Sequence, residues 1–279
     1  MRYLDAWTPI VLRAHRRATY IDASRDIFAA AALRVFGEFA DRIAGHELGV
    51  VILRAPTESL ATVLTGLGEP PGLSLRSVQD PGSLTVTGPV LAHLDIVAGS
   101  VLDEPALWRL VTRLAPGKAR EVLLIVPQTG AAQVAEYRAR LHDVGLTCAV
   151  AVELADVEGH VQLLLFATAD TKHLTRFKDE LWAADEFAGI RYRDPRDPRH
   201  TLIDISLSPQ LHHLREALLA ELARRGRCTV AELQQYTERE TIYRAADAAR
   251  VLTTAASAGT ISRDPPKGRM SPRTIVRVG

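Results

Sequence analysis

The chain has 279 residues, of which 47% are hydrophobic and 24% charged, a composition typical of a globular protein with a full core. No apolar run reaches the roughly 18 residues that a membrane span needs, and the early acid and tryptophan are unlike a signal peptide. Two isolated cysteines, Cys148 and Cys228, form no CxxC spacing and fit a reducing compartment without a metal site. We therefore expect a cytoplasmic protein of one large and one small domain that does not contact a membrane.

The formal net charge of +1 is unevenly distributed along the chain. Residues 208–279 contain twelve Lys and Arg against seven Asp and Glu, a net charge of +5. The other residues contain 22 basic against 26 acidic side chains, a net charge of −4. A basic C-terminal part on a mildly acidic body predicts that the two parts meet different partners.

Predicted helices and strands alternate through the first part of the chain. The first predicted helix, 4–17, contains Pro9, which implies a late start or a kink. Strands are predicted over residues 18–22, 49–54, 90–97 and 121–126, with weaker signals at 73–75 and 84–86. Helices are predicted over 27–43, 58–67, 104–114, 131–144 and 172–184, and a hairpin over 146–154 and 160–169. This order predicts a doubly wound, Rossmann-like α/β sheet with a terminal antiparallel hairpin, the layout of class I S-adenosylmethionine-dependent methyltransferases.

The turn after the first strand, residues 23–26, lies where a doubly wound fold binds nucleotide-type ligands. Such turns usually contain glycines, because backbone N–H groups must approach the ligand closely. This chain has no glycine between Tyr20 and Phe36. The pattern indicates a nucleotide-binding scaffold whose ligand loop has changed.

Two patterns resemble the three-Cys-motif partner proteins. Residues 3–10 (YLDAWTPI) followed by 19–22 (TYID) resemble the opening helix and first strand of that family. Residues 165–170 (LFATAD) and the Leu181-Trp182 pair resemble its "FAT" strand and the "(M/L)W" pair of the following helix. The resemblance implies a methyltransferase-like fold with a helical tail, and a partner bearing a three-cysteine motif.

The chain departs from the family pattern at the cofactor positions. Residues 23–27 (ASRDI) replace the family's FAGPG, and Arg54 stands where methyltransferases usually have an acid for the ribose hydroxyls. Residues 96–99 (IVAG) follow Asp95 without the family's proline and aromatic, and no NPPY or DPPY signature occurs. The absence of these motifs predicts a methyltransferase-like protein with a degenerate cofactor site, no catalytic residue and no bound cofactor.

Three polar residues remain at the predicted cofactor site: Asp22, Ser24 and Asp95. We interpret them as vestigial cofactor positions, and the acids alternatively cap helices or pair with Arg25 or Arg54. In the alternative hypothesis the three bind S-adenosylmethionine in an active nucleic-acid methyltransferase.

The sequence predicts three regions: a methyltransferase-like domain (1–189), a connector (190–207) and a winged-helix domain (208–279). We interpret the charged stretch 190–200 of the connector as a solvated link between the domains, with a recognition arm as the alternative. In the last, helices are predicted from Ser208, from a capping box of Thr229 with Glu232, and over 240–257. Strands predicted over 260–263 and 273–278 complete the winged helix. His212 and His213 are adjacent rather than four residues apart, so we predict no metal pair.

The winged helix predicts a nucleic-acid interface made of two groups of residues. The start of the third helix, which enters the major groove in helix-turn-helix proteins, is expected to expose Thr241, Tyr243 and Arg244, with Asp247 beside them. The wing provides four basic residues that would neutralise phosphates: Arg263, Lys267, Arg269 and Arg273. The predicted partner is duplex DNA, and the alternative is that this domain docks a protein.

Overall fold

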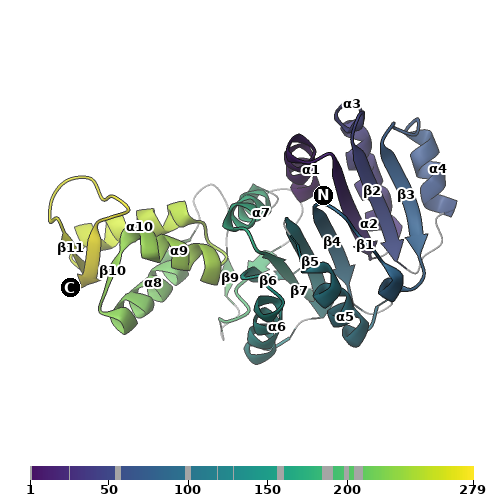
Figure 1. The fold of residues 1–279 in the computed structure, drawn as a ribbon. Helices are drawn as coiled ribbons and strands as arrows, with labels where there is room; N and C mark the ends of the chain where they lie inside the picture. The colour runs from purple at the N-terminus through teal and green to yellow at the C-terminus, as the bar shows by residue number, and fades with distance from the viewer. Residues whose placement is uncertain are drawn as a thin grey trace.

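The computed structural model describes residues 2–24, 26–53, 58–97, 102–117, 119–127, 129–155, 160–183, 191–197, 201–203 and 210–279 (Figure 1). They form a body (residues 2–203) built on one large sheet and a tail unit (residues 210–279) with a small sheet of its own. None of the helices in the described ranges combines the length and hydropathy needed to cross a membrane.

The large sheet has the strand order β3-β2-β1-β4-β5-β7-β6-β8-β9. The strands, in that order, are Leu73–Val78, Glu47–Leu53, Arg17–Ala23, Val90–Asp95, Arg120–Pro127, Val161–Thr168, Cys148–Ala155, Arg191–Arg193 and Leu202–Ile203. The five strands β3, β2, β1, β4 and β5 are parallel to one another. Strand β7 runs antiparallel to both of its neighbours, β5 and β6. This mostly parallel sheet with a terminal hairpin confirms the predicted Rossmann-like, methyltransferase-like fold.

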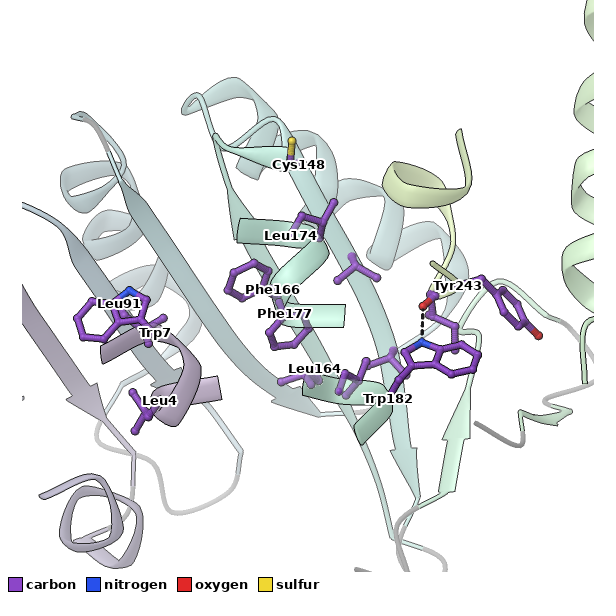
Figure 2. Close-up of a cluster of buried hydrophobic side chains, with 14 of the residues drawn as sticks. Leu4, Trp7, Leu91, Cys148, Leu164, Phe166, Leu174, Phe177, Trp182 and Tyr243 are labelled. Carbon is purple, nitrogen blue, oxygen red and sulfur yellow. Dashed lines mark hydrogen bonds between the residues drawn. The ribbon is translucent and has the colours of Figure 1, made fainter. Parts of the chain in front are cut away.

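Helices cover both faces of the sheet (Figure 1). One face packs against α1 (Arg2–Ala14), α2 (Asp26–Glu38), α3 (Ala40–Ile43), α4 (Glu58–Gly66) and α7 (Thr171–Ala183). The other packs against α5 (Glu104–Leu114) and α6 (Ala131–Asp143). Because the central strands are buried on both faces, their sequences are nearly continuous apolar runs. Figure 2 shows the α1 and α7 side, where Phe177 of α7 stacks on Phe166 of β7.

Several predicted boundaries differ from the structure. Helix α1 continues through Pro9 and ends at Ala14, and the predicted helix 27–43 divides at Phe39 into α2 and α3. A short 3₁₀ helix covers Pro81–Ser83, and the weak signal at 84–86 forms no strand.

The predicted connector is also different. Its described residues include the edge strands β8 and β9, in which Tyr192 and Ile203 are buried, so this part is not a solvated link. The apolar side chains that alternate with charged ones explain the difference, because they bury on one face of an edge strand.

The tail unit consists of three helices and a three-stranded antiparallel sheet of order β10-β12-β11. Its elements are α8 (His212–Arg225), β10 (Arg227–Thr229), α9 (Val230–Glu240), α10 (Ala245–Ser257), β11 (Ile261–Asp264) and β12 (Ile275–Val278). The predicted capping box of Thr229 and Glu232 opens α9. The predicted helix 240–257 starts only at Ala245, and the predicted start at Ser208 lies outside the described residues.

A buried lysine of α7 joins the body to the tail unit. Lys178 is fully buried, and its ammonium donates to the backbone carbonyls of Thr237 (3.1 Å), Tyr243 (2.8 Å) and Glu238. Burial lowers the pKa of Lys178 to about 7, and the nearby Glu238 carboxylate opposes this shift. The three acceptors lie at the end of α9 and in the turn before α10, so one side chain fixes the position of both helices.

Trp182, one turn further along α7, adds to this contact. Its indole N–H donates to the carbonyl of Ile242 (3.0 Å), and its ring packs against Tyr243, as Figure 2 shows. The guanidinium of Arg244 lies 4.7 Å from the centre of the Trp182 ring, in a cation–π contact. The turn between α9 and α10 is therefore packed against the body.

We predict that Lys178→Met lowers the free energy of unfolding by about 2–4 kcal/mol, because the buried carbonyls of Glu238 and Tyr243 lose the ammonium as donor, whereas that of Thr237 still accepts from Thr241. Urea unfolding at neutral pH measures the change. The matched control is Lys172→Met, at an exposed position of the same helix, with an expected change of less than about 0.5 kcal/mol. Equal stabilities of the two variants would contradict a fastening role for Lys178.

Candidate functional site

A cluster of buried polar side chains lies at the carboxyl end of β1. Asp22 is fully buried, and one of its oxygens accepts from the backbone N–H (2.8 Å) and the hydroxyl of Ser24. Its other oxygen accepts from the hydroxyl of Tyr20 (2.7 Å) and lies 3.5 Å from Nδ1 of His93. His93 is paired with Asp22 in the register of β1 and β4, which places the two side chains on one face of the sheet.

The surroundings keep the Asp22 carboxylate charged. Burial raises its pKa, but the contacts from His93, Ser24 and Tyr20 outweigh burial, and the pKa is lowered overall. Burial and the neighbouring Asp22 raise the pKa of Tyr20, so its hydroxyl stays protonated as a donor. Both oxygens of Asp22 are thus occupied by this chain's own donors.

The structure places Ser24 against Asp22 and places Asp95 at the end of the neighbouring strand β4. Asp95 is buried, and its side chain accepts from the backbone N–H of Val97 (2.7 Å). The predicted alternative partners Arg25 and Arg54 lie outside the described residues. Sequence reasoning missed His93, although a histidine inside the apolar run of residues 90–94 was a usable signal.

The first group of predicted nucleic-acid residues is not on an exposed face. Thr241 and Tyr243 are 3% and 2% exposed, and the Tyr243 hydroxyl donates to the carbonyl of Gln210 (3.1 Å). Arg244 is half-buried and pairs with the buried Asp247 (3.3 Å). The expected exposure of these residues was wrong, because the turn that carries them packs on α7 of the body.

The second group lies around the loop between β11 and β12. The guanidinium of Arg263 donates to the carbonyls of Pro266 (3.2 Å) and Gly268 (2.9 Å), so it shapes the loop. Lys267, Arg269 and Arg273 are exposed. This part of the expected interface is accessible.

A groove of about 800 Å³ lies between α10 and the β11–β12 loop. Its described lining residues are Ala249, Arg250, Thr253, Thr254, Ala256, Ser257, Arg263, Pro266, Gly268, Arg269 and Met270. They include three arginines and no acidic residue. Sequence reasoning missed Arg250, which is exposed on α10 and lies 3.8 Å from the carboxylate of the buried Asp247.

In the described ranges no group of three or more His, Cys, Asp or Glu side chains is placed to hold a metal ion. Both cysteines are buried and unbridged.

No protein-family model matches the sequence, and no curated protein matches it either. Similar solved structures include EvdMO1 (15% identity, TM-score 0.42, 63% of this chain and 42% of that one). The mitomycin 7-O-methyltransferase MmcR is also similar, with 15% identity and a TM-score of 0.38 over 60% of this chain and 53% of that one. An O-methyltransferase family protein from Burkholderia thailandensis has 10% identity and a TM-score of 0.36 over 60% of this chain and 57% of that one. The chain spans about half the length of the solved structures it matches. The fold assignment rests on the strand order of the sheet.

We predict that Asp22→Ala lowers the free energy of unfolding by about 2–4 kcal/mol, because Tyr20 and Ser24 are left without a buried acceptor. Since the pKa of Asp22 is lowered in the folded state, its contribution is fully present above its unfolded pKa and is lost as pH falls through the folded pKa. Urea unfolding should therefore give the same loss of stability at neutral pH and at about pH 5.

The control for Asp22 is Asp80→Ala, since exposed Asp80 also accepts from a backbone N–H two residues on (Gly82, 2.8 Å). Its expected cost is about 0.5–1 kcal/mol. If Asp22→Ala lowers the free energy of unfolding no more than Asp80→Ala does, the hydrogen bonds of Asp22 do not stabilise the buried cluster.

Proposed function

We propose that the protein binds duplex DNA through the groove of its tail unit, and that its methyltransferase-like body is a scaffold or partner-binding subunit rather than a conventional enzyme. The observation that carries the proposal is the groove itself, with three arginines and no acid among its described lining residues. Such a surface neutralises phosphates and releases counterions.

The architecture of the tail unit supports this proposal. Three helices and a β11–β12 hairpin beside the third support the proposal that the tail unit is a winged helix with α10 as its recognition helix. The middle of α10 presents Arg250, Thr253 and Thr254 to the groove, and the hairpin presents Arg263 and Arg269. In this proposal α10 contacts the duplex through its middle and end, because its start is packed on the body.

The chemistry at the carboxyl ends of the strands supports a scaffold role for the body. Both oxygens of Asp22 accept from this chain's own side chains and backbone, and the following turn has no glycine. A cofactor would have to compete with these buried contacts. From the sequence resemblance alone we further propose that a protein with a three-cysteine motif is a partner of the body.

We predict that changing Arg250 and Arg269 together to Ala weakens binding to unrelated duplexes about equally, by roughly tenfold at moderate salt. The slope of log affinity against log salt should fall by about 0.9 for each phosphate that the variant no longer neutralises. Fluorescence anisotropy with two unrelated duplexes at several salt concentrations measures both quantities.

The matched control replaces two exposed arginines of the body, Arg34 and Arg109, with Ala, and should leave the affinity unchanged. If the intact protein shows no salt-dependent affinity for any duplex, the tail unit is instead a protein-docking module.

A second candidate function is that of an active S-adenosylmethionine-dependent nucleic-acid methyltransferase. It is favoured by the position of Asp22 and Asp95 at the ends of the neighbouring strands β1 and β4. Calorimetric titration of the intact protein with S-adenosylmethionine separates the two functions. We expect no binding, because the Asp22 oxygens are occupied; a micromolar Kd would favour the enzyme.

A further inference from the structure

A second cavity, the α1–α7 pocket, lies away from the tail groove and from the Asp22 cluster. It has a volume of about 290 Å³ and is lined by Tyr3, Trp7 and Ile10 of α1 and by Lys172, His173 and Arg176 of α7. One wall is therefore aromatic and aliphatic, and the other is basic. The volume is at the lower end of the range of small-molecule sites.

A buried carboxylate orients three of the side chains that line this pocket. Glu121, the second residue of β5, is fully buried and accepts from the Trp7 indole N–H (3.0 Å) and from the Tyr3 hydroxyl. The same carboxylate lies 2.6 Å from Nδ1 of His173. Side chains held in this way are pre-organised, which lowers the entropy cost of binding a ligand.

The basic wall favours an anionic ligand. The contact with Glu121 raises the pKa of His173, against the opposing effect of burial, and so favours its charged form. With Nδ1 engaged by Glu121, a charged ring has its Nε2–H to donate elsewhere. Lys172, in the first turn of α7, and Arg176, one turn further on, are both exposed on the same helix.

The apolar wall favours a ligand with a ring. Ile10 is 40% exposed although it is a large aliphatic residue, and it lies at the pocket beside the aromatic side chains of α1. Burying this surface against a flat apolar group is favourable, while the polar contacts set its orientation. Hydrogen bonds to Glu121 already hold α1 and α7 against β5. The packing of the two helices therefore does not require an exposed isoleucine at position 10, opposite the basic residues of α7.

We propose that the α1–α7 pocket binds a small aromatic carboxylate, with the ring against Trp7 and Ile10 and the carboxylate against His173, Lys172 and Arg176. The proposal is independent of DNA binding by the tail unit, since none of these residues lies in the groove.

The test is a titration of the intact protein with benzoate and with indole-3-acetate, followed through the ¹H–¹⁵N resonances of the tryptophan indoles. The Trp7 resonance should shift while those of Trp108 and Trp182 stay, with a Kd of about 1 mM or tighter for at least one acid. The neutral isostere indole-3-acetamide and the ringless anion acetate should each bind at least about tenfold more weakly.

Two variants at exposed positions test the site without disturbing the core. Arg176→Gln should weaken binding about threefold to tenfold, and Ile10→Glu, which adds a like charge at the apolar wall, should abolish it. Arg109→Gln, at an exposed arginine of α5, is the matched control and should bind as the unchanged protein does. Thermal unfolding confirms that all three variants fold.

Three results would overturn the proposal. One is no shift of the Trp7 resonance with either acid at about 10 mM. Another is equal affinity for the acid and its amide. The third is unchanged binding by both Arg176→Gln and Ile10→Glu.

Discussion

The orientation of the tail unit is held by the fully buried ammonium of Lys178, with Trp182 and Arg138 adding hydrogen bonds beside it. The last carbonyls of a helix have no intrahelical donor and carry partial negative charge, so a cation at that end is favourable. Lys178 of α7 donates to the carbonyls of Glu238 and Tyr243, and adds a third donor to that of Thr237, which already accepts from Thr241. Because leaving a buried acceptor without a donor is costly, the tail unit cannot rotate on the body without breaking these bonds.

Two buried carboxylate–histidine pairs organise the α1 and α7 side of the sheet in a similar way. Asp22 with His93 joins β1 to β4, and Glu121 with His173 joins β5 to α7. The parallel register pairs Asp22 with His93 and aligns Glu121 with Leu91 of β4, so both carboxylates project from the same face. In each pair the carboxylate also accepts from a tyrosine, which satisfies a buried charge through several donors.

The parts predicted correctly from sequence depend on local patterns. The apolar repeat predicts α5 over Glu104–Leu114, and Thr229 with Glu232 predicts the start of α9. The short strands β8, β9 and β10 were missed, because two or three residues give no periodicity and their partners are distant in sequence. The burial of Tyr243 was missed for a related reason: its polar neighbours suggest a surface turn, and only the packing of α7 against that turn covers it.

The same packing separates the proposed DNA-binding groove from the carboxyl ends of β1 and β4 in the body. Since the start of α10 is covered by α7, a duplex can reach only the middle of that helix and the β11–β12 loop. Figure 1 places this loop at one end of the molecule and β1 well beyond the interface on the other side. A duplex in the groove would therefore lie at the far end of the tail unit from β1, the strand that carries Asp22. A protein that modified the bases bound in its own groove would need the two sites adjacent. The proposed DNA-binding groove and the Asp22 cluster are therefore separate sites, and the proposed role of the tail unit does not involve the body's strand ends.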